Sequence, residues 1–148
     1  MKIFIATDHR GYSLKEKIKT WLSDWNYEFE DFGAFTLNPD DDYPDFIAKV
    51  AEAVSVDPKS SVGIVLGGSG QGEAIVANKY KEVRAVVYYG GPEDIIKLSR
   101  EHNDANVLSL GASFLDEKNI KGIIKLWLET KFSGDERHIR RINKIELK

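Results

Sequence analysis

A hydroxyl and a carboxylate lie close together in a glycine-rich stretch near the middle of the chain. Ser69 and Glu73 follow the apolar run 62–66 and are interleaved with four glycines, which are Gly67, Gly68, Gly70 and Gly72. An apolar run that ends in glycines predicts a buried strand and a tight turn, and residues 73–79 can form a helix after it. Such a turn gathers backbone N–H groups that can hold an anion or a developing oxyanion. Beside a bound carbonyl, Glu73 could act as a base.

The glycines alone leave a second interpretation open. Tight turns between a strand and a helix occur in many α/β proteins simply because the chain must turn and pack closely. The stretch lacks the Lys-Ser/Thr ending of a nucleotide-binding P-loop, and Glu73 stands where a dinucleotide-binding motif has its third glycine. A carboxylate repels a phosphate but is useful beside a carbonyl, so these residues favour proton transfer over nucleotide binding.

Polar side chains that could take part in catalysis also adjoin two other apolar runs. Asp8 and His9 follow the run 2–7, and His102 and Asn103 stand shortly before the run 107–110. Each has a structural alternative, because Asp8 can cap the following helix, His9 can simply pack, and His102 can interact with a helix dipole. The end of its helix could also bring His102 near the other groups.

An aspartate run and an arginine cluster are more ambiguous. The three consecutive aspartates at 40–42 cannot all face one metal ion easily, so a solvated loop is the favoured interpretation. Arg137, Arg140 and Arg141 form either a positive helix face or a phosphate anchor, because guanidinium binds phosphate bidentately. A carboxylate base, a hydroxyl, backbone N–H groups, histidines and separate arginines are the set that moves a proton between neighbouring carbons of a sugar.

The elements that must position these groups alternate between strands and helices. The pattern predicts strands at 2–7, 27–32, 62–66, 84–88 and 107–110, and helices at 13–25, 43–54, 73–79, 93–100 and 116–130, with a last helix within 133–148. In the first helix we expect the lysines at 15, 17 and 19 on the polar side. This alternation predicts an α/β fold with a five-stranded parallel sheet and helices on both faces. The site of such a fold lies at the carboxyl ends of the strands.

Length and composition indicate one globular domain that spans residues 1–148. The 148 residues are 42% hydrophobic and 30% charged, with a net charge of −3 and a pI of about 5.7. We expect no nucleic-acid or membrane partner, because the chain has no broad basic field and no apolar run of spanning length. Without a signal-peptide core, a cytoplasmic location is expected. The absence of cysteine excludes a disulfide frame, a thiolate zinc site and a cysteine nucleophile.

Several segments together resemble one known family. They are Ala6-Thr-Asp-His-Arg-Gly-Tyr-Ser-Leu-Lys15, Asp42-Tyr-Pro-Asp45, Gly67-Gly-Ser-Gly-Gln-Gly-Glu-Ala-Ile-Val-Ala-Asn-Lys79, Arg84-Ala, Ser99-Arg-Glu-His-Asn-Asp-Ala-Asn-Val107 and Arg137-His-Ile-Arg-Arg141. In this order they resemble ribose-5-phosphate isomerase type B, a group that includes galactose-6-phosphate isomerase subunits. The resemblance implies a Rossmann-like three-layer α/β/α sandwich. It also implies an aldose–ketose isomerase that acts on a small phosphosugar through a cis-enediolate, with no metal and no cofactor.

The same resemblance implies an assembly and a base. The family forms homodimers, often paired into tetramers, in which two chains share each active site; the tail helix within 133–148 would contact the partner subunit. One version of the family site has a cysteine at the position of Gly67, and the other has a glutamate at the position of Glu73. This chain, which lacks cysteine, follows the glutamate version. Glu73 would then be the base that interconverts ribose 5-phosphate and ribulose 5-phosphate.

The remaining roles implied by the resemblance concern the substrate. Ser69 would assist the base, and the backbone N–H groups that stabilise the enediolate would be those of Gly68, Gly70, Gln71 and Gly72. Asp8 and His102 would open the furanose ring, and Asn103 would position sugar hydroxyls. The residues that would hold the phosphate are His9, Arg137 and Arg141.

One position departs from the family pattern. After the last strand the family usually has an arginine that contributes to phosphate binding, and here the matching residue is Ser113. A lost charged hydrogen bond costs about 1.5–3 kcal/mol, which is roughly a ten- to hundred-fold loss of affinity. Arg10 and Arg140 are the candidates to replace it. The departure leaves open a hexose or hexose-phosphate isomerase of the allose 6-phosphate or galactose 6-phosphate type. A non-catalytic sugar-phosphate-binding module and one subunit of a hetero-oligomeric isomerase also remain open.

Overall fold

The computed structural model describes residues 1–146, and the expected alternation of strands and helices is confirmed. The strands are β1 (Lys2–Thr7), β2 (Phe29–Asp31), β3 (Ser61–Gly67), β4 (Ala85–Tyr88) and β5 (Val107–Gly111). The helices are α1 (Tyr12–Asp24), α2 (Pro44–Val56), α3 (Gln71–Ala77), α4 (Glu93–Asn103), α5 (Glu117–Glu129) and α6 (Glu136–Glu146). The expected tail helix is thus present as α6, and the last two residues of that expectation lie outside the described residues. In the described part of the chain we find no helix with the length and apolarity needed to cross a membrane.

The five strands form one parallel sheet with the order β2-β1-β3-β5-β4. Strands β1 and β3 are neighbours, but the chain leaves β1 through α1 toward β2 and leaves β3 through α3 toward β4, on the other side of the sheet. The crevice at their carboxyl ends is therefore a topological switch point. Open α/β sheets bind ligands at such points.

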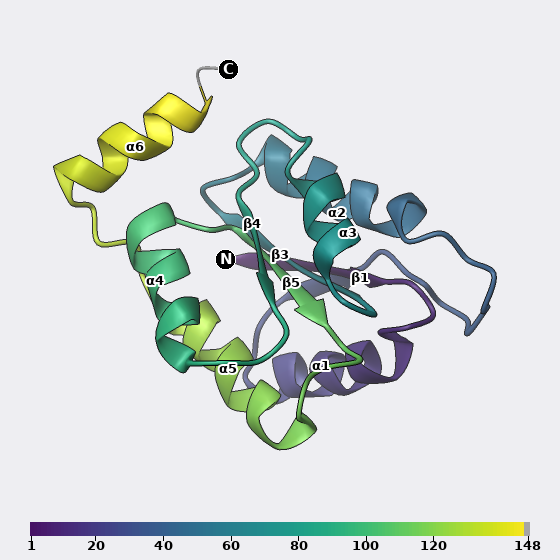
Figure 1. Cartoon of the computed structure of the whole chain (residues 1–148). Coiled ribbons are helices and arrows are strands. Elements are labelled where there is room, and N and C mark those ends of the chain that lie inside the picture. Colours follow the sequence, from purple (N-terminus) through teal and green to yellow (C-terminus); the bar gives the residue numbers. More distant parts are fainter. Residues whose placement is uncertain (147–148) are drawn as a thin grey trace.

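Helices cover both faces of the sheet, so the expected three-layer architecture is confirmed (Figure 1). One apolar cluster joins α1, α4 and α5 to the sheet, and the other joins α2 and α3 to the opposite face. Strand β3 runs through the middle of the sheet, and all seven of its residues are buried. Its apolar run therefore reflects burial on both faces rather than a half-exposed strand.

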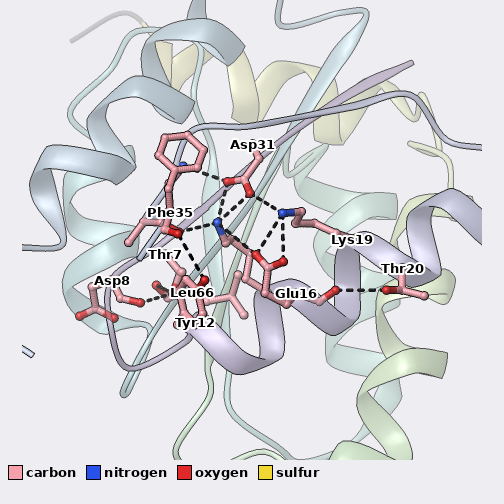
Figure 2. Close-up of polar contacts among 12 residues, drawn as sticks. Thr7, Asp8, Tyr12, Glu16, Lys19, Thr20, Asp31, Phe35 and Leu66 are labelled. Atoms are coloured by element: carbon pink, nitrogen blue, oxygen red, sulfur yellow. Dashed lines mark hydrogen bonds and ion pairs between the residues drawn. The ribbon is translucent and has the colours of Figure 1, made fainter. Parts of the chain in front are cut away.

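Lys15 does not lie on the polar side of α1 as expected, because it is completely buried. Its ammonium group lies 2.7 and 2.8 Å from the two carboxylate oxygens of Asp31 and 2.7 Å from the carbonyl oxygen of Ala34. Figure 2 shows this cluster, in which Lys19 reaches the same carboxylate of Asp31. The backbone N–H of Ala34 in turn donates to the carbonyl of Thr7, at 2.7 Å. The buried ion pair therefore ties the segment after β2 to the end of β1, beside the switch point.

Candidate active site

The ends of β1 and β3 form the floor of the candidate site. Thr7 and Leu66 are register partners, so Asp8 and Gly67 are the next residues on adjacent strands. The Thr7 hydroxyl lies 2.9 Å from the carbonyl oxygen of Asp8 and 3.1 Å from that of Leu66, which joins the two strand ends. The sheet therefore brings Asp8 and the glycine-rich turn to one point, as the sequence predicts.

The glycine-rich turn is shaped by one residue in the left-handed conformation. Gly70 has a φ of 76°, and α3 begins at the next residue. The Ser109 hydroxyl of β5 donates to the carbonyl of Gly70 at 2.6 Å and fixes the turn from below. Ser69 is exposed above the turn, and its hydroxyl accepts a hydrogen bond from the Gln71 N–H at 3.3 Å. The first turn of α3 thus faces the site with N–H groups that have no acceptor inside the helix.

Glu73 is a buried carboxylate in this turn, with 4% of its surface exposed. A Cβ added to Gly67 would lie 1.7 Å from Glu73 Oε1, so the carboxylate occupies the space that a side chain at position 67 would fill. Burial raises the pKa of the Glu73 carboxyl, a hydrogen bond from its own backbone N–H opposes this, and the negative charge of Asp8 raises the pKa further. A carboxylate of raised pKa is a stronger base than an exposed one, as general base catalysis near neutral pH requires.

We expect Gly67→Ala to keep the fold and to remove most of any activity that depends on Glu73. The new methyl group would overlap only the far end of a flexible side chain, so the carboxylate can move aside at little cost in stability. A displacement of about 1 Å at a reacting group can lower turnover about 100-fold. The matched control is Gly122→Ala, since nothing lies within 4 Å of a Cβ at Gly122 in α5. That control should keep wild-type turnover, and a thermal melt of each variant checks the fold. Unchanged turnover in Gly67→Ala would contradict a role for the Glu73 carboxylate.

His9 is held by a carboxylate that the sequence assigned to solvent. Asp41 Oδ1 accepts hydrogen bonds from the His9 backbone N–H at 3.0 Å and lies 2.6 Å from His9 Nδ1. The Asp41 side chain is only 7% exposed, whereas Asp40 and Asp42 are exposed. The expectation of a solvated loop is therefore wrong for Asp41, because it packs against the histidine. With Nδ1 engaged, the Nε2 end of the imidazole is the end left for a ligand.

Asp8 belongs to the same cluster. Its Oδ1 accepts the backbone N–H of Arg10 at 2.9 Å, and side-chain atoms of Asp8, His9 and Asp41 lie within 4.8 Å of one another. The spacing would suit a metal ion. However, the short contact between His9 and Asp41 is explained by a direct hydrogen bond, which leaves that pair committed to each other.

Tyr43 is a site neighbour that the sequence analysis missed. A Cβ added to Gly72 would lie 2.7 Å from the Tyr43 hydroxyl oxygen, so the segment before α2 packs over the first turn of α3. The motif from Asp42 to Asp45 contained the signal, because a motif in a loop indicates contact with a site more often than a role in the core. Only the three-dimensional structure reveals that this loop covers the glycine turn.

Within one chain, His102 and Asn103 do not join this cluster. They end α4, and the chain then enters β5 at Val107, whose register partner is Gly63 near the start of β3. They therefore lie at the amino edge of the sheet, whereas Glu73 lies at the carboxyl edge. Figure 1 shows α6 beside α4, away from the tip of β5, so Arg137 and Arg141 on α6 lie far from Glu73 as well.

A second histidine accompanies His102. The rings of His102 and His138 are stacked, with centroids 4.2 Å apart and planes at 15°. His138 is 3% exposed and comes from α6, so the stack fastens α6 to the end of α4. Burial lowers the pKa of His138, and the positive charges of His102 and Arg137 lower it further. The stack thereby assembles His102, Arg137 and Arg141 into a second group, which carries histidine and arginine side chains and lacks the base.

The fold and its residues define a Rossmann-like α/β protein with a candidate proton-transfer site at the switch point of its sheet. A family model described as ribose/galactose isomerase matches residues 3–145. The chain therefore belongs to the ribose/galactose isomerase family, and the expected enzyme class, aldose–ketose isomerase, is confirmed.

Named relatives agree with this family. The chain is 37% identical over 143 residues to ribose-5-phosphate isomerase B of Mycobacterium tuberculosis, covering 97% of this chain and 86% of the relative. It is 40% identical over 144 residues to a probable ribose-5-phosphate isomerase B of Mycoplasma genitalium, covering 97% and 92%. A crystal structure of the Mycoplasma genitalium enzyme with bound ribulose-5-phosphate has a TM-score of 0.94 and covers 99% of this chain and 94% of that chain, at 37% identity. The Clostridium thermocellum enzyme has a TM-score of 0.91 at 42% identity, with coverage of 99% and 96%.

Proposed function

We propose that this protein interconverts ribose 5-phosphate and ribulose 5-phosphate, with Glu73 as the base. The observation that carries the proposal is the buried Glu73 carboxylate, which fills the space beside Gly67 at the start of α3. Relatives that are 37–42% identical and bear the name ribose-5-phosphate isomerase B support the choice of sugar. We infer a cytoplasmic location from the same metabolic role.

The proposed reaction moves one proton between two carbons. The Glu73 carboxylate removes the proton from C2 of the open-chain aldose, and the C–H electron pair forms the enediolate while the carbonyl oxygen becomes negative. N–H groups at the start of α3 stabilise that oxygen. Protonated Glu73 then returns the proton to C1, which gives the ketose. Ser69, exposed beside the turn, exchanges the proton between the two neighbouring oxygens.

We propose that a second chain supplies the other half of the site. Asp8, His9, Ser69 and Glu73 gather at one edge of the sheet, while His102, Asn103, Arg137 and Arg141 gather at the other. A two-fold dimer that sets the amino-edge group of one chain against the carboxyl edge of its partner would complete both sites at once. Exposed apolar residues support such an interface: Ile139 of α6 is 43% exposed, and Tyr89 and Phe114 beside the glycine turn are 54% and 67% exposed. In this arrangement Arg137 and Arg141 hold the phosphate, and His102 and Asp8 open the ring.

Mixed dimers should regain activity if two chains share each site. We expect Glu73→Gln and His102→Ala to be inactive alone and to recover roughly a quarter of wild-type turnover when co-expressed at equal amounts. Half of the dimers are then mixed, and each mixed dimer has one intact site. A mixture of Glu73→Gln with Ser69→Ala is the matched control, since both changes lie in the same half and no intact site can form. Recovery in the control, or none in the test mixture, would contradict the shared site.

The proposed activity is tested by isomerisation of ribose 5-phosphate by the purified protein with chelator present. Allose 6-phosphate, galactose 6-phosphate and ribose serve as parallel substrates. Turnover mainly of ribose 5-phosphate supports the proposal. Preference for a six-carbon sugar phosphate would keep the proton transfer and replace the substrate. Binding without turnover of any aldose would favour a sugar-phosphate-binding module or a missing hetero-partner instead.

A further inference from the structure

We propose that Arg10, opposite Ser113, is the residue that binds the substrate phosphate from the chain that carries Glu73. This inference rests on the proposed phosphosugar isomerase and names a specificity residue within it. It resolves how a site whose last strand ends in a serine can still anchor a dianion.

Arg10 and Ser113 approach the glycine turn from opposite sides. A Cβ added to Gly68 would lie 3.6 Å from Arg10 Cγ and 3.6 Å from Ser113 Oγ. The two side chains come from different strand ends, because Arg10 follows β1 and Ser113 follows β5. The N–H of Ser113 donates to the carbonyl of Gly68 at 3.0 Å, which fixes the serine beside the turn. A charge from either position can therefore reach the same space above Gly68.

The guanidinium of Arg10 is available to a ligand. Arg10 is exposed, and within the described part of the chain its printed bond is the one from its backbone N–H to Asp8. The side chain extends several bonds beyond Cγ, and its planar group can bind two phosphate oxygens at once. The small Ser113 leaves the volume above Gly68 to it, whereas an arginine at 113 would bring a second positive charge into that volume.

The charges around Arg10 are compatible with this role. Asp8 and Asp41 are the nearby carboxylates, and each already accepts hydrogen bonds, Asp8 from the Arg10 N–H and Asp41 from His9. His9 precedes Arg10 directly and has its Nε2 end free for the same anion. The other candidate, Arg140, lies on α6 with the amino-edge group, so within one chain it cannot replace Arg10.

The test combines loss of the charge with its return from the other strand. Arg10→Ala, Ser113→Arg and the double variant are compared with wild type by KM and kcat for ribose 5-phosphate, and by calorimetric titration with inorganic phosphate. Because Arg10 is exposed, Arg10→Ala should fold, which a thermal melt checks. We expect Arg10→Ala to raise KM and the phosphate Kd roughly ten- to a hundred-fold, with kcat within about three-fold. Adding Ser113→Arg should restore both constants to within about three-fold of wild type.

Each result decides the proposal. An unchanged KM and Kd in Arg10→Ala, or a fall in kcat without a change in KM, would overturn it. Failure of Ser113→Arg to restore binding would refute the shared position. Lys118→Ala, an exposed charge on α5, is the matched control and should change nothing. The phosphate titration does not require turnover, so weakened phosphate binding in Arg10→Ala would support the anchor even if ribose 5-phosphate were not the substrate.

Discussion

Glu73→Gln is expected to lower turnover of ribose 5-phosphate by roughly 10²- to 10⁴-fold, because it removes the base and keeps the shape of the side chain. The measurement is kcat with saturating substrate, together with sugar-phosphate binding by calorimetry. Binding should remain within a few-fold of wild type, since glutamine still fills the space beside Gly67. Glu52→Gln makes the same chemical change at an exposed position of α2 and should leave turnover intact. Turnover in Glu73→Gln equal to that of wild type would exclude Glu73 as the base.

The same variant should be more stable than wild type at neutral pH. Burial raises the pKa of Glu73 in the folded state, so ionised Glu73 opposes folding once the pH exceeds the ordinary glutamate range. Below that range the carboxyl is protonated in both states, and the difference between variant and wild type should vanish. Melting temperatures of the two proteins measured from acid to neutral pH test this sign. A stability difference that grows as the pH falls would contradict the burial argument.

Lys15→Met is expected to lower the free energy of unfolding by about 3 kcal/mol, which is the low end for breaking a buried ion pair. The low end applies because Asp31 keeps Lys19 and the Gly33 N–H as partners. For a chain of this size the melting temperature should fall by roughly 6–12 °C. Lys17→Met is the matched control, since Lys17 pairs with Glu117 in an exposed contact that contributes little. Equal effects of the two changes would contradict the structural importance of the buried pair.

The effect of Lys15→Met should also depend on pH. Burial alone would raise the pKa of Asp31, but hydrogen bonds from Lys15, Lys19 and the Gly33 N–H outweigh it and lower the pKa. The stability from this carboxylate is therefore present above the ordinary aspartate pKa and is lost as the pH falls through the lowered value. The gap between wild type and variant should narrow in the same acid range. Thermal melts across that range measure it.

Periodicity was sufficient for the fold and for one half of the site. The apolar runs that become β1 and β3 are buried on both faces, and the alternation with helices admits a parallel sheet with few alternatives. Because parallel strands end at one edge, Asp8, Ser69 and Glu73 could be assigned to the same site before their distances were known. The short strands β2 and β4 were also predicted, with small errors at their ends.

Side-chain burial was harder to predict where charges have partners far away in sequence. Lys15 follows the same helical pattern as Lys17, and Asp41 stands between two exposed aspartates, so local sequence cannot separate the buried members from the solvated ones. Their partners, Asp31 and His9, are brought in by the sheet. A buried charge is stable only beside such a partner.

The sequence by itself determined the sheet, the glycine turn, the base candidate and the family resemblance, because these depend on local periodicity and on motifs along the chain. Only the tertiary structure decided that His102 and the arginines of α6 lie at the amino edge, fastened by the stack with His138. The same structure brought Arg10 and Ser113 to one glycine. The physical reason is that strand order and helix packing set which distant segments meet, and these depend on contacts between residues far apart in the chain.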